Sequence, residues 1–420
     1  MHLLKNRNYL LLRSGWTISS FGSQLQSFAF SLYVLAVTRS TLQYSLTLCM
    51  EFLPVLILAP FSGYLADRFN RKMQIILFDL LSAFAVVLLF LIYIAKGQLQ
   101  IFEIYLCVLI LSSCQTFFSP SASCLIQSAV APEDYTKQKS VDSTISSMIM
   151  LFAPAAAGVL YGFFGIGVVL IINAASFLFS MVMEIFLRLP GYTAENHDAA
   201  PVSFFQSLGE GVTHIRKSRF ILSFLFVLSL LNFILPGVEI GLMSVSQRLL
   251  HLDSFMIGIA CSALSAGMLF GAIACGLLAK RIERIPINRI IVCSIAVDCV
   301  VFLLIGGWLK FFYPLLPVLL NVLLFIGLNF ILTFGNAILS VNLNVQFQRQ
   351  VPNALMGRIS ALVSAVLTAC VPLGQITAGL LMSNLPYCYA YLIEGFFCIL
   401  LLGYSFNNSR KSAIIVRKVA

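Results

Sequence analysis

The chain has 420 residues, of which 60% are hydrophobic and only 10% are charged, and its formal net charge is +10. Its mean hydropathy of +0.97 lies far outside the range of a soluble domain. This composition excludes a water-soluble enzyme and a soluble nucleic-acid-binding protein, so most of the chain must lie in lipid.

Apolar segments long enough to cross a bilayer follow one another along the chain. A helix needs about 20 apolar residues to cross ~30 Å of hydrocarbon. Strand alternation is absent from the sequence, and in lipid only helices and closed barrels satisfy the backbone. We therefore expect an all-α membrane protein with twelve transmembrane helices, at residues 9–37, 41–66, 73–95, 101–128, 140–162, 164–188, 219–247, 253–279, 287–309, 314–344, 357–381 and 386–407.

Lysine and arginine sort to one side of these predicted helices. With both termini in the cytoplasm, 22 of the 26 basic residues fall in cytoplasmic segments, and only Arg39, Lys96, Arg248 and Lys310 fall outside. This asymmetry follows the positive-inside rule. We expect a multi-pass protein of the plasma (inner) membrane with both termini cytoplasmic, whose positive charge reflects topology and anionic lipid rather than nucleic acid.

The decapeptide GYLADRFNRK at residues 63–72 joins the second and third predicted helices. Gly63 permits close approach of a neighbouring helix, and Asp67 lies near a helix end, where a facing helix N-terminus or an arginine can hold it. Arg68 and Arg71 can pair with carboxylates or lipid phosphate. The cluster fits a conformational latch at the inner face of the protein, although its charges also fit a patch that only fixes topology.

One long connection, at residues 189–218, separates two halves of the chain. It contains an amphipathic stretch whose apolar residues recur at helical spacing and whose end is basic. We expect a six-helix bundle at 1–188, a cytoplasmic linker with an amphipathic helix at 189–218, and a second six-helix bundle at 219–420.

The second half of the chain repeats features of the first. The segment GLLAKRIERI at 276–285 is a degraded copy of GYLADRFNRK, 213 residues further on. Three further positions recur at an offset of 221 residues, namely Gln127, Val130 and Gly158 in the first half and Gln348, Val351 and Gly379 in the second. Duplicated membrane halves are typical of secondary transporters.

These motifs resemble those of a known family. GYLADRFNRK is similar to the loop signature of the major facilitator superfamily, with Asn70 where Gly is commoner. Together with LPVLILAPFSGYLADR, Asp79, PEDYTKQKS and VPNALMGRISAL at 351–362, it resembles the macrolide-efflux and enterobactin-exporter branch of that superfamily. The resemblance covers nearly the whole chain.

The resemblance implies twelve helices in two pseudo-symmetric six-helix bundles, a central cavity, alternating access and proton antiport. It also implies that Asp67, Arg68 and Arg71 form the latch, and that Gly357 and Arg358 are its counterpart ahead of the eleventh helix.

Carboxylates inside predicted helices are informative because an ionised one near the bilayer centre costs roughly 2.5–3.5 kcal/mol on insertion scales. Glu51 lies at about mid-depth in the second helix, and Glu239 follows Pro236–Gly237 in the seventh, where a broken helix exposes carbonyl groups. We expect these two to bind substrate or a proton. Asp79 and Asp298 lie in helices that the resemblance places at the periphery, so structural pairing is the expectation there.

Uncharged polar side chains on the first, fourth, seventh and tenth predicted helices are further candidates for lining a cavity. They are Gln24, Gln26, Gln115, Asn232, Asn329 and Asn336. The alternative is interhelical hydrogen bonding, worth about 0.6 kcal/mol for each.

The expected function is secondary active transport, in the form of a proton-coupled exporter of an amphipathic small molecule such as a drug or a siderophore. No Arg or Lys lies at mid-depth in a predicted helix, whereas a carrier of sugars or organic anions would usually place one there. A transporter of lysophospholipid or another lipid and a transport-dead membrane sensor remain alternatives.

We expect no enzyme, because the sequence contains no paired catalytic carboxylates at helical spacing, no H-E-x-x-H, no G-x-S-x-G and no phosphate loop. The eleven cysteines form no C-x-x-C pair, so no metal site is expected. The expected partners are a small-molecule substrate and membrane lipid, the expected form is a single chain, and the proton gradient takes the place of a cofactor.

Overall fold

The structure is a computed structural model that describes residues 6–188, 213, 216, 218–282, 284–351 and 356–419. Side chains at positions 60, 67, 132, 219, 220, 356–358 and 408–419 are outside this description. The described residues form helices and no strand, which confirms the predicted all-α fold class.

The chain divides into two compact units. The first consists of Met1–His197 and Leu252–Ser262, and the second of Asp198–His251 and Ala263–Ala420. The division into bundles at 1–188 and 219–420 stays a prediction, and the amphipathic helix expected within 189–218 lies almost wholly outside the described residues.

The helices of the first unit are α1 (Arg7–Thr38), α2 (Thr41–Arg68), α3 (Arg71–Lys96), α4 (Ile101–Ser128) and α5 (Tyr135–Ile185). The second unit contains α7 (Arg219–Ile234), α8 (Pro236–Arg248), most of α9 (Ser254–Leu277), α10 (Ala279–Ile282), α11 (Ile287–Gly307), α12 (Val318–Gln350), α13 (Met356–Asn384) and α14 (Tyr387–Val419).

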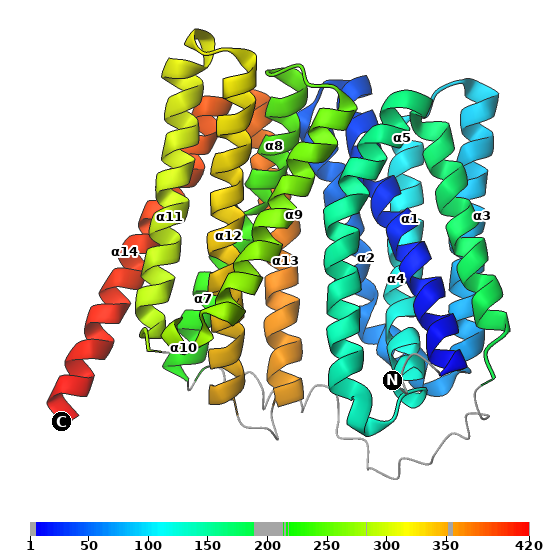
Figure 1. The fold of residues 1–420 in the computed structure, drawn as a ribbon, viewed down its shortest axis with the longest axis horizontal. Helices are drawn as coiled ribbons and strands as arrows, with labels where there is room; N and C mark the ends of the chain where they lie inside the picture. Colours follow the sequence, from blue (N-terminus) through cyan, green and yellow to red (C-terminus); the bar gives the residue numbers. More distant parts are fainter. Residues whose placement is uncertain are drawn as a thin grey trace. The chain divides into compact units, whose positions relative to one another are not determined.

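Helix α5 corresponds to two predicted spans. Its 51 residues would form a straight helix of about 77 Å, far longer than a bilayer is thick. Gly165, with φ 75° and ψ −176°, breaks the helix, and glycine tolerates this conformation because it has no Cβ. The resulting first arm (135–164) and second arm (166–185) are visible in Figure 1 and match the predicted helices 140–162 and 164–188.

Ten helices in the described part of the chain are long and apolar enough to cross a membrane, with both arms of α5 counted as one. Helix α1, which contains the predicted span 9–37, is not among the ten. Twelve crossings therefore stay a prediction, whereas a multi-span helical fold is confirmed.

In the first unit α1 packs along α5, α3 packs along both α4 and α5, and α2 packs along α4. Figure 1 shows α1 lying between the two arms of α5. Close approach depends on small residues: a Cβ added at Gly15 of α1 would lie 3.0 Å from the Ser180 hydroxyl on the second arm. The second arm is therefore held against both α1 and α3.

The connection between α2 and α3 is held by side chains that complete the backbone hydrogen bonding of helix ends. Asn70, the departure from the family signature, caps α3 by accepting from the backbone N–H groups of Lys72 and Met73 at 3.0 and 3.2 Å. The Nε2 of Gln74 donates to the carbonyl of Leu65 at 2.7 Å. The helices consequently extend two residues further into this connection than predicted.

In the second unit α11 packs along α14 and α12, and α13 packs along α7 and α8. The predicted span 219–247 is divided between α7 and α8 at Leu235, immediately before Pro236. Gly374 of α13 lies against this break, because a Cβ there would collide with the backbone of Phe233.

Candidate functional site

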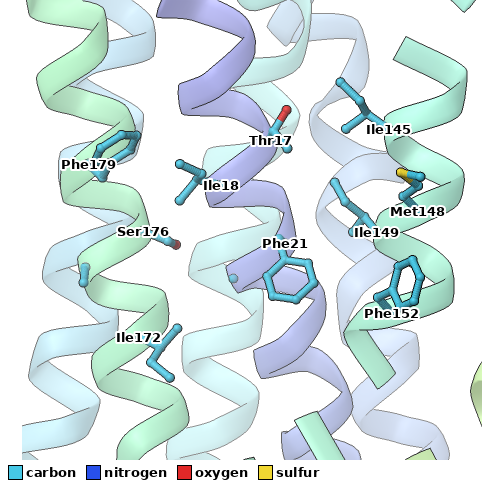
Figure 2. Close-up of a pocket in the computed structure, with 12 residues that line it drawn as sticks. Thr17, Ile18, Phe21, Ile145, Met148, Ile149, Phe152, Ile172, Ser176 and Phe179 are labelled. Carbon is cyan, nitrogen blue, oxygen red and sulfur yellow. The ribbon is translucent and has the colours of Figure 1, made fainter. Parts of the chain in front are cut away.

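An apolar pocket of about 650 Å³ lies in the first unit, between α1 and the two arms of α5 (Figure 2). It is lined by Thr17, Ile18, Phe21 and Gly22 of α1, by Ile145, Met148, Ile149 and Phe152 of the first arm, and by Ile172, Ala175, Ser176 and Phe179 of the second arm. Steps of three and four residues place each set on one helix face. The volume falls within the range of about 300–1,000 Å³ that is typical of small-molecule sites.

The lining offers a ligand almost no polar group. The hydroxyl of Thr17 donates to the carbonyl of Arg13 at 2.7 Å, and the hydroxyl of Ser176 donates to the carbonyl of Asn173 at 2.7 Å. None of the twelve lining residues is charged. The pocket is therefore suited to an apolar molecule or to the apolar part of an amphipathic one.

The pocket is accessible from outside the unit. Met148 and Phe152 of the first arm are 55% and 56% exposed, and Ile18 and Phe179 on the opposite walls are also exposed. These residues were not predicted from the sequence, because apolar side chains at helical spacing give the same pattern whether they face lipid, core or a pocket.

Glu51 of α2 lies between α1 and α4. Its carboxylate accepts a hydrogen bond from the hydroxyl of Ser27 on α1, and its backbone carbonyl accepts one from the hydroxyl of Ser112 on α4. The side chain is half-buried. The structure thus places this predicted site residue where three helices of the first unit meet.

The three predicted glutamines of the first unit differ in their surroundings. Gln24 is exposed, and Gln115 is exposed with its amide donating to Ser119 at 3.1 Å. Gln26 is only 1% exposed and accepts a hydrogen bond from the amide of Asn173 on α5 at 2.8 Å. Gln26 therefore links α1 to α5, whereas Gln24 and Gln115 are exposed and accessible to a ligand.

In the second unit Glu239 lies in the first turn of α8 and its side chain is exposed. Asn232 of α7 is half-buried, and its amide donates to the carbonyl of Leu228 one turn earlier at 2.9 Å. Asp298, for which structural pairing was expected, accepts a hydrogen bond from the amide of Asn336 at 2.9 Å.

The predicted latch residues are only partly described. The guanidinium carbon of Arg68 lies 4.7 Å from the centre of the Tyr64 ring, and the Nε of Arg71 donates to the carbonyl of Ala66 at 2.9 Å. At Gly63 an added Cβ would meet no heavy atom within 4 Å. The side chains at positions 67, 357 and 358 lie outside the described structure, and the latch stays a prediction.

A buried ion pair joins α1 to the first arm of α5. Nη1 of Arg13 lies 3.0 Å from Oδ1 of Asp142, and Nη2 donates to the Asp142 carbonyl at 3.2 Å. The guanidinium also lies 4.2 Å from the centre of the Trp16 ring, and Gln138 donates to the second carboxylate oxygen. This cluster was not predicted from the sequence, because it joins residues 129 positions apart.

No group of three or more His, Cys, Asp or Glu side chains capable of holding a metal occurs among the described residues. All eleven cysteines are free.

Comparison with known proteins identifies the family. The sequence profile described as Major Facilitator Superfamily matches residues 15–374. An uncharacterised MFS-type transporter of Bacillus subtilis, YfiS, is 27% identical over 412 residues, which cover 95% of this chain and 92% of that protein. Macrolide efflux protein A of Streptococcus pyogenes is 21% identical over 402 residues, with 95% of both chains covered. The multidrug efflux pump Tap of Mycobacterium bovis is 23% identical over 372 residues, covering 86% of this chain and 84% of Tap.

Solved structures agree on the fold. A bacterial homologue of the iron transporter ferroportin in its inward-facing state has a TM-score of 0.71 at 17% identity, covering 96% of this chain and 99% of that one. The POT family transporter PepTSo has a TM-score of 0.71 at 13% identity, covering 97% and 99%. These similarities cover both halves of the chain and show its fold. With the profile matched over most of its length, the chain belongs to the Major Facilitator Superfamily and is a multi-pass membrane transporter.

Proposed function

We propose that the chain is a proton-coupled exporter of amphipathic small molecules of the macrolide type, working by alternating access. The observation that carries this proposal is the uncharged pocket between α1 and α5, which has the size of a small-molecule site. The names of two relatives that align over most of the chain, a macrolide efflux protein and a multidrug efflux pump, support the same substrate class.

The pocket favours a macrolide-like substrate over the alternative of a lysophospholipid. A phosphate head group is generally held by Arg, Lys or a cluster of backbone N–H groups. The twelve lining residues include no cation, and their two hydroxyls already donate to carbonyl groups. The apolar face of a macrolide needs none of these donors.

The carboxylate of Glu51 complements the amine that macrolides such as erythromycin carry. At neutral pH this amine is a cation, and a half-buried carboxylate attracts it more strongly than one in water. In this proposal Glu51 holds the charged part of the substrate, and Gln24 and Gln115 of the same unit offer polar contacts. Glu239 and Asn232 stay candidate binding residues of the second unit. The protein lies in the plasma membrane as a single chain with both termini in the cytoplasm.

Filling the pocket tests its role directly. Ala175 is exposed on the pocket wall, so Ala175→Trp adds a large ring to the pocket without displacing the helix core. We expect erythromycin efflux from a macrolide-sensitive host to fall about tenfold, equivalent to about 1.4 kcal/mol of lost binding. The measurement is the initial rate of efflux of radiolabelled erythromycin, with expression checked on blots.

The matched control is Leu178→Trp, which puts the same ring on the same arm at an exposed position that does not line the pocket. Efflux should remain at the wild-type rate in this variant. Equal efflux by both tryptophan variants would mean that the pocket does not bind the substrate.

Neutralising Glu51 tests the recognition of the amine. Glu51→Gln keeps the shape and the hydrogen bond from Ser27 but removes the charge, so we expect the KM for erythromycin to rise about tenfold or more while folding is unchanged. Glu103→Gln is the control, because Glu103 is engaged with Lys96 at 2.5 Å at the start of α4. An unchanged KM in Glu51→Gln would remove Glu51 from the site.

A further inference from the structure

Two carboxyl groups are buried together between α3 and the second arm of α5. Asp79 of α3 is 4% exposed and Glu184 of α5 is 2% exposed. The two groups interact electrostatically, and the hydroxyl of Ser180, one turn before Glu184, lies beside both. Because α3 and α5 pack along each other, the carboxyl groups belong to the core of the first unit.

Hydrogen bonds leave part of this cluster unsatisfied. Oδ2 of Asp79, Oε2 of Glu184 and Oγ of Ser180 are buried without a hydrogen-bond partner. One hydroxyl has a single proton and can donate to only one of the two carboxyl groups at a time. A second proton is therefore needed to satisfy the cluster.

Charged groups nearby do not neutralise the pair. Among the described side chains no ion pair includes Asp79 or Glu184. The ammonium of Lys72, on the same helix as Asp79, donates instead to the carbonyls of Ile185 and Leu187 at 2.8 and 2.9 Å.

The described residues of α4 and α1, which also pack against α3 or α5, form no ion pair with the two carboxyl groups. Helix α4 contributes the buried thiol of Cys114 beside Asp79. Helix α1 presents Gly15 to Ser180, and its buried Arg13 is bound to Asp142 at 3.0 Å. Two neighbouring carboxylates in such an environment cannot both be ionised without a large cost, from burial and from mutual repulsion.

We propose that Asp79 and Glu184 form a proton-binding site that couples export to the proton gradient. The pair holds one proton shared between the two carboxyl groups and carries a single negative charge. Release follows when a conformational change admits water to the pair: one O–H bond breaks, the proton passes to water and two hydrated carboxylates remain, and uptake reverses this step. The pair titrates as a unit, so the proton is not assigned to either residue.

This inference rests on the proposed function, because it names the coupling site of the proposed exporter. It also places the proton apart from Glu51: the carboxyl pair lies between α3 and the second arm of α5, an arm that also lines the pocket, whereas Glu51 lies between α1, α2 and α4. Glu184 is the penultimate residue of α5, and Lys72 closes the end of that helix. The proton therefore has a short path to the end of the unit where α3 begins with its basic residues.

The test compares two modes of transport in proteoliposomes containing the wild-type protein or the double variant Asp79→Asn/Glu184→Gln. Counterflow of radiolabelled erythromycin at uniform pH needs no net movement of protons, whereas accumulation driven by a pH gradient does. One proton exchanged across a gradient of about one pH unit sustains about tenfold accumulation. We expect the double variant to keep counterflow and to lose this gradient-driven accumulation, which a merely structural role would not produce.

A second measurement does not depend on transport. Infrared difference spectra of the purified wild type minus the double variant should contain the carbonyl stretch of a protonated carboxyl at neutral pH, and this band should disappear at high pH. Spectra of wild type minus Glu103→Gln should lack it, because Glu103 is an ionised partner of Lys96. If the double variant does not fold, Asp79→Asn and Glu184→Gln are compared singly in the same two measurements.

The outcomes separate this inference from the proposed function. Gradient-driven accumulation that exceeds the passive trapping in protein-free liposomes and persists in the double variant, or a difference spectrum without the protonated band, overturns the coupling site. A wild-type protein that shows no erythromycin counterflow contradicts the proposed substrate class, and in that case the infrared band alone decides whether the pair holds a proton.

Discussion

Replacing Arg13 by methionine is expected to destabilise the protein by about 3 kcal/mol, because it leaves the carboxylate of Asp142 without its cation in a largely buried position. The Arg13 side chain is 7% exposed and that of Asp142 is 22% exposed, so water screens the pair only partly. Arg13 also contacts Trp16 and the Asp142 backbone, and these contacts would be lost together. The measurement is the thermal unfolding midpoint of the purified protein in a mild detergent.

The control for this prediction is the double variant Arg13→Met/Asp142→Leu, which removes both charges at once. Apolar residues of similar volume often replace a buried ion pair at little cost, so the double variant should regain most of the stability that Arg13→Met alone loses. A midpoint for Arg13→Met equal to that of the wild type would show that the pair contributes nothing to holding α1 against α5.

Asp67→Asn is expected to reduce erythromycin transport by about tenfold or more while leaving substrate binding unchanged. The reason is that a latch residue stabilises one conformation of the transporter, and such coupling energies are typically about 1–3 kcal/mol, or roughly 5–150-fold. Transport in proteoliposomes and binding to detergent-solubilised protein are measured on the same preparation.

Glu133→Gln is the matched control, because Glu133 is an exposed carboxylate that precedes the first arm of α5 and has no place in the predicted latch. It should transport at the wild-type rate. Wild-type transport by Asp67→Asn would show that residues 63–72 only fix the topology of the chain.

The helices could be predicted from the sequence because a long apolar segment directly indicates a span buried in lipid. The predicted helices 140–162 and 164–188 meet within two residues of Gly165, whose positive φ breaks α5. The boundaries at residues 63–72 were less accurate, because Asn70 caps α3 through its side chain and lengthens the helix. A cap of this kind depends on local geometry rather than on hydropathy.

The candidate site could be predicted only in part. Glu51 was singled out by its charge within an apolar segment, and the structure places it between three helices. The partners of Arg13 and Gln26 lie 129 and 147 positions away, and no pattern in a single sequence links such residues. Glu184 was overlooked because it lies at the very end of its helix, where a carboxylate would ordinarily reach water, yet packing against α3 buries it.

Proton-coupled export of macrolides is tested most directly by the accumulation of radiolabelled erythromycin in proteoliposomes loaded with an acidic buffer. Protein-free liposomes measure the passive trapping of this weak base, and Asp67→Asn proteoliposomes supply the matched variant. We predict that wild-type proteoliposomes accumulate erythromycin well beyond both controls and lose the excess when a protonophore is added. If the purified protein is folded but its proteoliposomes accumulate no more erythromycin than protein-free liposomes, the result would contradict a proton-coupled exporter of macrolides.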